Sequence, residues 1–160
     1  MNLLTIRRMQ LIDVPVVHAI DVLSFSLPWP ERSFRHEVTN NPASRCWVAE
    51  SGTESQSCIV GMLVLWLIED EAHIATLAVH PEQRRQGIGE RILLSALQAA
   101  KSEGARRAYL EVRASNTAAQ SMYDKYGFSL AGRRPGYYKD NSEDAILLTL
   151  ENLNDLPEEA

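Results

Sequence analysis

Between residues 80 and 90 the chain reads His80-Pro81-Glu82-Gln83-Arg84-Arg85-Gln86-Gly87-Ile88-Gly89-Glu90. The residues before it, 72–79, form an apolar run typical of a strand, and those from Ile88 onward place apolar side chains at helical spacing. A turn rich in arginine and glycine that begins a helix directs several backbone N–H groups into one small volume, together with the positive end of the helix dipole. The segment therefore predicts a binding site for a phosphate or pyrophosphate group.

The composition indicates one globular domain. The chain has 160 residues, of which 45% are hydrophobic and 23% charged, with a formal net charge of −5. We expect the domain to span residues 1–151 and to be followed by an acidic, flexible tail at 152–160. The acidic balance argues against a nucleic-acid partner, because no basic excess is available to neutralise phosphates.

Three further observations bear on location and metal content. The four histidines are scattered and the two cysteines, Cys46 and Cys58, show no paired spacing, so we expect no metal site. The longest apolar run, residues 59–68, is about half the length of a membrane span. The first residues lack the pattern of a signal peptide. We expect a cytoplasmic protein with no membrane partner.

The order of predicted elements is β-α-α-β-β-β-α-β-α-β-β, which indicates an α+β fold in three layers with a βαβ unit at its centre. The predicted strands cover residues 3–8, 45–50, 58–67, 72–79, 108–113, 128–132 and 145–151. The predicted helices begin after Asp13, at Glu31, at Ile88 and at Thr117. Short polar links between the second, third and fourth strands predict antiparallel hairpins, and the last two strands are expected to pair as a hairpin.

Two of the helices have a recognisable inner face. The first is expected to be capped by Asp13 and to bury Val16, Val17, Ile20 and Leu23. The helix from Ile88 has a longer apolar stripe, made of Ile88, Ile92, Leu93, Ala96, Leu97 and Ala100.

Two nucleotide-binding motifs fit the glycine turn poorly. A dinucleotide fold needs a third glycine where this chain has Ile92, although Glu111 stands roughly where its ribose ligand would. A P-loop needs Gly-Lys-Ser/Thr, whereas Gly89 is followed by Glu90-Arg91. Three antiparallel-looking strands also precede the turn, whereas a dinucleotide fold normally begins with it, so both motifs are weak matches.

The turn instead resembles the acetyl-coenzyme A signature of the GNAT N-acetyltransferases, Gln/Arg-x-x-Gly-x-Gly/Ala, at Arg84-x-x-Gly87-x-Gly89. A second block downstream is similar to the protein N-terminal acetyltransferase branch, which includes the ribosomal-protein alanine acetyltransferases. The likeness covers nearly the whole chain. Its other segments are Phe25-Ser26-Leu27-Pro28-Trp29, Leu110 to Asn116, Ala119, Met122-Tyr123-x-x-Tyr126-Gly127-Phe128, Arg133 to Tyr138 and Glu143-Asp144-Ala145.

The resemblance implies a mixed, mostly antiparallel sheet of about seven strands with about four helices. It implies transfer of an acetyl group from acetyl-CoA to the N-terminal amine of a protein, with a ribosomal protein among the candidate partners. Two alternatives remain: a GNAT enzyme that acetylates a small-molecule amine or a lysine side chain, and a non-catalytic acyl-CoA-binding protein. We expect a monomer or a weak homodimer.

The resemblance also assigns residues to the cofactor. Backbone groups of Leu77 and Val79 would lie along the pantetheine, and Asn116 would contact the cofactor arm, although an asparagine there equally suits a helix cap. A Cβ at either glycine of the turn would crowd the approach to the pyrophosphate. The predicted pyrophosphate residues are Arg84, Arg85, Gln86, Gly87, Ile88 and Gly89.

Acetyl transfer to an amine requires a neutral amine and a protonated leaving thiolate. A peptide α-amine with a pKa near 8 is already about a tenth neutral at pH 7, so a modest base suffices. The resemblance nominates Glu111 as that base, with His73 on the neighbouring strand as the alternative, and Tyr123 as the acid near the thioester sulfur. Strand alternation places Glu111 on one face with Tyr109 and Arg113.

The acceptor residues are expected in two loops. In this branch the loop between the first two helices and the loop between the last two strands flank the substrate N-terminus, which nominates Leu27, Trp29, Tyr137 and Tyr138. Adjacent tyrosines on a strand point to opposite faces, so only one of Tyr137 and Tyr138 is expected to contact substrate.

Overall fold

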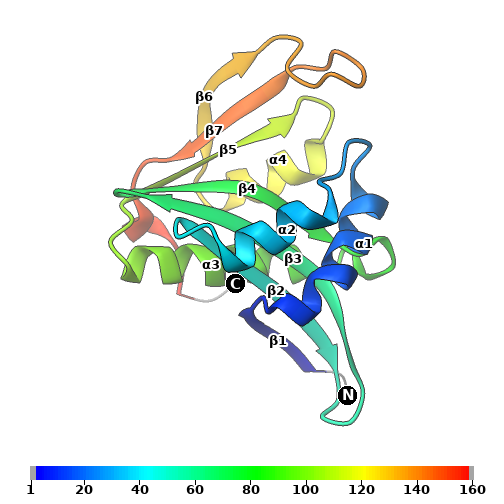
Figure 1. Ribbon diagram of the computed structural model, residues 1–160. Helices are drawn as coiled ribbons and strands as arrows, with labels where there is room; N and C mark the ends of the chain where they lie inside the picture. Colours follow the sequence, from blue (N-terminus) through cyan, green and yellow to red (C-terminus); the bar gives the residue numbers. More distant parts are fainter. Residues whose placement is uncertain (1–2, 159–160) are drawn as a thin grey trace.

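Seven strands form a single sheet in the computed structural model, which describes residues 3–158 (Figure 1). They lie in the order β1-β2-β3-β4-β5-β7-β6, and only the β4–β5 pair is parallel. This confirms the expected mixed sheet and its antiparallel hairpins. The strands are β1 (Leu3–Arg8), β2 (Ser44–Gly52), β3 (Ser57–Ile68), β4 (Glu71–Val79), β5 (Arg107–Arg113), β6 (Ser129–Arg134) and β7 (Ala145–Leu150).

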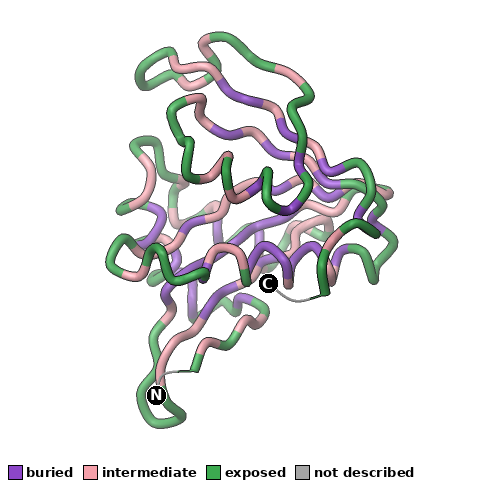
Figure 2. The backbone as a smooth tube through the Cα atoms, turned by 180° about the vertical axis from the view of Figure 1, so that it is seen from behind, coloured by how far each residue is buried: buried purple, intermediate pink, exposed green. Residues whose placement is uncertain are grey.

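Helices cover both faces of the sheet, which gives the three layers predicted. Within residues 3–158 none of them is long and apolar enough to cross a membrane. Helices α1 (Val14–Ser24) and α2 (Glu31–Thr39) pack on one face over β2, β3 and β4. On the other face, α3 (Ile88–Ser102) buries the whole of its predicted apolar stripe, and α4 (Thr117–Lys125) follows β5. Buried residues run along the middle strands and α3 in Figure 2.

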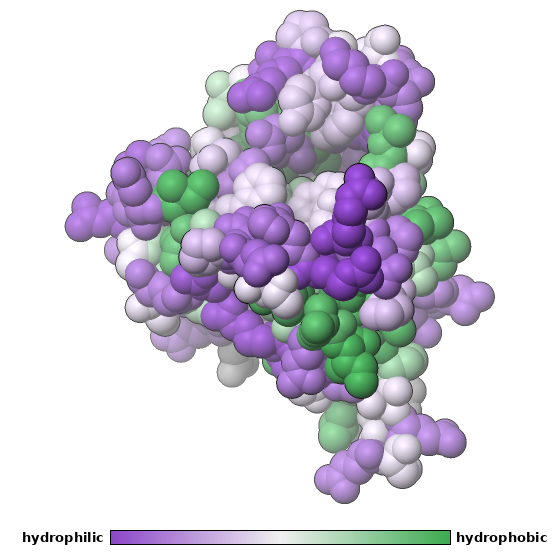
Figure 3. Space-filling model, in the orientation of Figure 1, coloured by the Kyte–Doolittle hydropathy of each residue, from purple (hydrophilic) through white to green (hydrophobic). Residues whose placement is uncertain are grey.

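Helix α1 differs from expectation in the face that it buries. Val17 and Ile20 are buried as predicted, but Val16 and Leu23 are exposed, and Asp21 is buried in their place. Exposed apolar atoms accordingly gather over the start of α1 in Figure 3. The sequence pattern missed this face because a buried carboxylate interrupts the apolar stripe.

Asp13 precedes α1 but makes no side-chain cap on it. Its carboxylate instead accepts hydrogen bonds from Arg7 at 2.8 and 3.0 Å and from the backbone N–H of Gln10 at 2.7 Å. The expected N-cap is therefore wrong, since this side chain ties β1 to the short 3-10 turn η1 (Leu11–Asp13).

The two parallel strands separate after a short pairing. Residues Glu71–Ile74 of β4 pair with Arg107–Leu110 of β5, and neither strand pairs with the other beyond that point. A β-bulge in β4 lies there, since Ile74 and Thr76 face consecutive residues of β3 and leave Ala75 without a partner. The two strands thus lie side by side at one end and diverge at the other (Figure 1).

The start of the expected flexible tail is packed against the domain. A 3-10 turn, η3 (Leu153–Asp155), buries Leu153, whose backbone N–H donates to the carbonyl of Arg106 at 2.9 Å. The Gln98 side chain on α3 donates to the carbonyls of Pro157 and Glu158 at 2.9 and 2.7 Å. Apolar burial and these bonds hold residues 153–158 in place; the last two residues of the expected tail lie outside the described part of the chain.

Candidate active site

A cleft of about 890 Å³ opens where β4 and β5 diverge. Its walls come from the diverging halves of the two strands, the first turns of α3 and α4, and the loop between α1 and α2. Three residues that we expected in the site, Gln86, His73 and Tyr137, do not line the cleft. The expected residues that do line it are Leu27, Trp29, Leu77, Val79, Arg84, Arg85, Gly87, Ile88, Gly89, Glu111, Asn116, Tyr123 and Tyr138.

The glycine turn lies at the mouth of the cleft and begins α3. Gly87 is the N-cap and has a φ of 76°, a conformation that favours glycine. A Cβ added at Gly89 would meet Val79 and Met122 at 3.6 and 3.7 Å, which is ordinary contact. Packing within the protein therefore does not require glycine at position 89. Gly89 lines the cleft, so the absence of a side chain there leaves its backbone accessible from the cleft.

The two arginines of the turn behave differently. The Arg84 guanidinium donates from Nε to the carbonyl of Val79 at 3.0 Å and from Nη2 to Ser24 Oγ at 3.2 Å. It thus ties the turn to the end of β4 and to α1. Arg85 has a φ of 65° and an exposed side chain beside the cleft, so it is the more available of the two for an anion.

Asn116 caps α4. Its Oδ1 accepts a hydrogen bond from the backbone N–H of Ala119 at 3.1 Å. The same residue also lines the cleft, and its contact with the cofactor arm stays a prediction.

Glu111 and His73 meet across the two parallel strands. His73 Nε2 lies 2.7 Å from Glu111 Oε2, and both side chains are mostly buried, with exposed fractions of 18% and 16%. The hydrogen bond from His73 is the main reason that the pKa of Glu111 lies below its usual range, although burial opposes it. The carboxylate is therefore ionised at neutral pH, where it faces the cleft.

An aromatic row fixes the His73 ring. Its face stacks on Tyr109, with ring centroids 4.4 Å apart, and its edge meets Trp66 at 5.3 Å. Trp66 in turn stacks on Trp29 at 6.3 Å. The row connects the α1–α2 loop to the carboxylate of Glu111, and the sequence did not reveal it because Trp66 comes from a third strand.

Tyr123 of α4 also lines the cleft. It is 6% exposed, and its ring packs edge-on against Phe128, with ring centroids 5.4 Å apart. Burial raises the pKa of its hydroxyl well above 10, so the group stays protonated at neutral and mildly alkaline pH. The hydroxyl is therefore a hydrogen-bond donor for an anion formed beside it.

Trp29 is positioned by a buried carboxylate. Asp21 is 1% exposed, and its Oδ2 accepts the backbone N–H of Trp29 at 2.7 Å. Burial raises the pKa of Asp21, while this hydrogen bond opposes the rise. No sequence pattern indicated this role, because Asp21 lies within an apolar helical pattern, where a charged residue is expected to face solvent.

Tyr137 and Tyr138 lie in the loop between β6 and β7, residues 135–144, and not on a strand. Their rings meet edge to face with centroids 5.1 Å apart. The expectation that a strand turns them to opposite faces is wrong, yet only Tyr138 lines the cleft. The ring of Tyr138 lies under the guanidinium of Arg113 at 4.0 Å, and burial raises the pKa of its hydroxyl to about 12.

These features agree with the comparison with known proteins. The model of the acetyltransferase (GNAT) family matches residues 14–128, which include the glycine turn, Glu111 and Tyr123. The chain belongs to the GNAT acetyltransferase family. A Bacillus subtilis (strain 168) protein, provisionally named a ribosomal protein bS18-alanine N-acetyltransferase, is 39% identical to this acetyltransferase over 143 residues, 89% of this chain and 92% of the relative.

Solved structures extend the likeness to three dimensions. The crystal structure of the ribosomal-protein-S18-alanine N-acetyltransferase from Escherichia coli is 29% identical to this acetyltransferase, with a TM-score of 0.81. The match covers 92% of this chain and 93% of that one. NAA60 of Arabidopsis thaliana, solved with acetyl-CoA, shares the fold at 19% identity, with a TM-score of 0.84 over 93% and 99% of the two chains.

Proposed function

We propose that this acetyltransferase transfers the acetyl group of acetyl-CoA to the N-terminal amine of a protein in the cytoplasm. The supporting observation is that an ionised carboxylate, Glu111 of β5, and a protonated phenol, Tyr123 of α4, line the same cleft. The names of the relatives point to a ribosomal protein with an N-terminal alanine as the acceptor.

The cleft fits acetyl-CoA. Its volume of about 890 Å³ lies within the range of ligand pockets, and the turn at Gly87 presents the N-terminus of α3 to a pyrophosphate. Leu77 and Val79 lie in the part of β4 that no longer pairs with β5, so the backbone groups of Leu77 and the N–H of Val79 are available to the pantetheine, while the Val79 carbonyl accepts Arg84 Nε. Acetyl-CoA, when bound, supplies an acetyl group activated as a thioester.

The acceptor amine must lose a proton, and the ionised Glu111 is placed to take it. His73 Nε2 already carries the hydrogen of the 2.7 Å bond to Glu111, so His73 orients the carboxylate and Glu111 receives the proton. The amine of a peptide N-terminus has a pKa near 8, so Glu111 needs to supply only a modest driving force at pH 7.

Tyr123 completes the proton balance. The C–N bond forms as the C–S bond breaks, and the leaving sulfur needs one proton. The hydroxyl of Tyr123 holds that proton, because burial keeps its pKa well above the working pH. The proton released by the amine and the proton given to the sulfur are thus handled by two different residues that line the cleft, Glu111 and Tyr123.

Mass spectrometry on a panel of amines tests the proposal. The panel holds peptides that begin with Ala, Ser, Met or Leu, each with one internal lysine, together with N-terminally blocked copies and small polyamines. We expect acetylation at the N-terminal amine of the Ala and Ser peptides and none on the blocked copies. Products only on lysine or on small amines would refute the acceptor, and binding of acetyl-CoA without any product would refute catalysis.

A further inference from the structure

One arginine joins three segments at the acceptor end of the cleft. Arg113, the last residue of β5, makes a two-pronged ion pair with Asp140, with Nη1–Oδ1 and Nη2–Oδ2 distances of 3.1 and 2.9 Å. Its Nη1 also donates to Glu143 Oε1 and to Asn141 Oδ1, each at 3.3 Å. The side chain is 22% exposed, so this is a partly desolvated, bidentate pair and not a loose surface contact.

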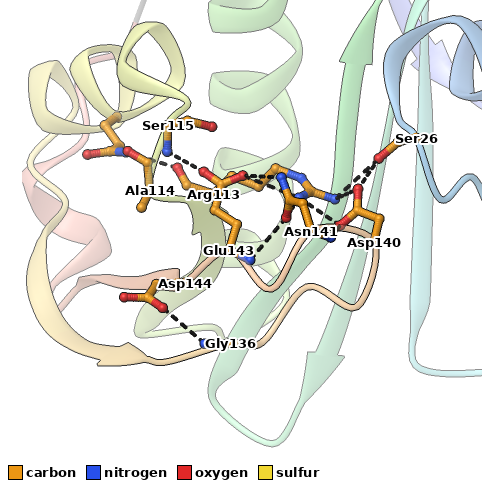
Figure 4. A network of polar contacts seen from close by, with 10 residues as sticks. Ser26, Arg113, Ala114, Ser115, Gly136, Asp140, Asn141, Glu143 and Asp144 are labelled. Atoms are coloured by element: carbon orange, nitrogen blue, oxygen red, sulfur yellow. Dashed lines mark hydrogen bonds and ion pairs between the residues drawn. The ribbon is translucent and has the colours of Figure 1, made fainter.

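The same network extends to the loop on the other side of the cleft (Figure 4). Ser26, in the α1–α2 loop, donates a hydrogen bond to Asp140, and Arg113 Nη2 lies 3.5 Å from its Oγ. Glu143 Oε2 accepts the backbone N–H of Ser115 at 2.6 Å, just before the cap of α4. The two loops therefore meet through side chains, 114 residues apart in the sequence.

The network also holds Tyr138. The Arg113 guanidinium lies 4.0 Å from the centroid of its ring, and both residues line the cleft. A cation held over an aromatic face by two carboxylates cannot move without breaking those pairs. The position of the Tyr138 ring thus depends on Arg113, and the ring borders the space through which an acceptor reaches Glu111.

We propose that Arg113 is a positioning residue that sets the width of the acceptor entrance, by tying the α1–α2 loop to the β6–β7 loop and holding Tyr138 between them. Arg113 thereby affects how the acceptor and its first side chain bind. It does not affect the binding of acetyl-CoA or the proton transfers. This inference rests on the proposed function for the nature of the acceptor, but not for the existence of the link.

The test replaces Arg113 with methionine, which keeps the apolar stem and removes the guanidinium. We expect Arg113→Met to raise the KM for an Ala-starting peptide about tenfold or more, with kcat and the KM for acetyl-CoA changed by less than about twofold. Preference for Ala over Leu at the first position should fall several-fold, because the entrance widens. Arg113→Lys should recover little of the loss, since an ammonium cannot form the two-pronged pair.

A matched control lies nearby. Arg133, at the end of β6, pairs with Asp144 at 2.6 Å, but it is 58% exposed and does not line the cleft. Arg133→Met should leave both KM values and the Ala/Leu preference unchanged. If Arg113→Met behaves like Arg133→Met, the proposal is wrong; equal losses in kcat and in coenzyme A affinity would instead show a general structural role and would also overturn it.

A second variant decides the matter if Arg113→Met does not fold, as judged by thermal melting. Asp140→Asn keeps the shape and removes the charge, and should shift the peptide KM and the Ala/Leu preference in the same direction, by about threefold. An unchanged preference would overturn the proposal. If the wild-type protein acetylates an amine other than a peptide N-terminus, the proposed function fails. The role of Arg113 is then tested by measuring the KM of the same variants for that amine.

Discussion

The side chains of His73 and Glu111 are 2.7 Å apart, although the last backbone pair between their strands is Ile74 with Leu110. The carboxylate therefore bridges the two strands at the point where the main chains begin to separate. The ring of His73 stacks on Tyr109 and meets Trp66 edge-on, and these contacts hold its Nε2 against Glu111 Oε2. A donor held in this way keeps the carboxylate ionised and fixed beside the cleft.

The first prediction concerns Glu111 itself. Glu111→Gln removes the proton acceptor but can still accept a hydrogen bond from His73, so the site keeps its shape. We expect kcat to fall about a hundredfold, with the affinity for coenzyme A unchanged in calorimetry. Glu103→Gln is the control, because that carboxylate pairs with Arg45 far from the cleft and should not alter kcat. An active Glu111→Gln enzyme would remove Glu111 from the mechanism.

The second prediction uses pH to separate the two members of the pair. His73→Phe keeps an aromatic ring between its neighbours and removes the hydrogen bond that lowers the pKa of Glu111. That pKa should rise, so the carboxylate is protonated at a higher pH. The acid limb of the kcat profile should move towards neutral pH in His73→Phe; a limb at the wild-type position would show that His73 does not control Glu111.

The third prediction concerns Tyr123 and the alkaline side of the profile. A raised pKa means that the phenol keeps its proton as the pH rises, so wild-type activity should not decline through loss of this proton below about pH 10. Tyr123→Phe should lower kcat about a hundredfold at every pH. Tyr126→Phe, which loses only a 3.3 Å bond to Glu90, should retain wild-type kcat. Equal rates for the two variants would contradict the role of Tyr123.

The fourth prediction separates packing from cofactor binding at the glycine turn. Gly89→Ala meets only ordinary contacts and improves helix propensity, so the free protein should become more stable by up to about 1 kcal/mol. The added methyl would lie beside Val79 and Met122, which line the cleft, and should weaken coenzyme A binding only a few-fold, because the acetyl-coenzyme A signature also admits alanine at this position. Gly61→Ala is the opposite case, because its Cβ would lie 2.7 Å from Ile92 Cδ1 and should lower the melting temperature. Unchanged affinity in Gly89→Ala would contradict this use of the turn.

The fifth prediction concerns stability at low pH. Burial opposes ionisation of Asp13, but the hydrogen bonds from Arg7 and Gln10 outweigh it, and the pKa of Asp13 lies below its usual value. The folded protein then binds fewer protons than the unfolded chain, so stability falls as the pH drops below about 4. Asp13→Ala should cost about 1–3 kcal/mol at pH 7 and flatten the acid dependence in urea unfolding. A variant with the wild-type acid profile would contradict this.

Local patterns predicted much of this molecule. The helix from Ile88 and the hairpins of β2, β3 and β4 were predictable because periodicity and turn residues act over a few positions. The buried face of α1 was not, because Asp21 is buried by a bond to Trp29 in a later loop. Arg113 was placed correctly on one face with Glu111, but its partners Ser26 and Asp140 lie 87 and 27 residues away, and no periodicity links them.

The C-terminal segment adds a mechanical property to the cleft. The two halves of the sheet are fastened at the closed end, by the short β4–β5 pairing and by η3, whose Leu153 is buried and whose following residues are held by Gln98 of α3. Because the two halves of the sheet are joined only at this end, a small rotation of one half about the β4–β5 pairing becomes a larger displacement at the open end of the cleft. Substitutions at Leu153 should therefore alter the distance between Gly87 and Asn116, although both residues lie at the open end of the cleft and Leu153 lies at the joined end.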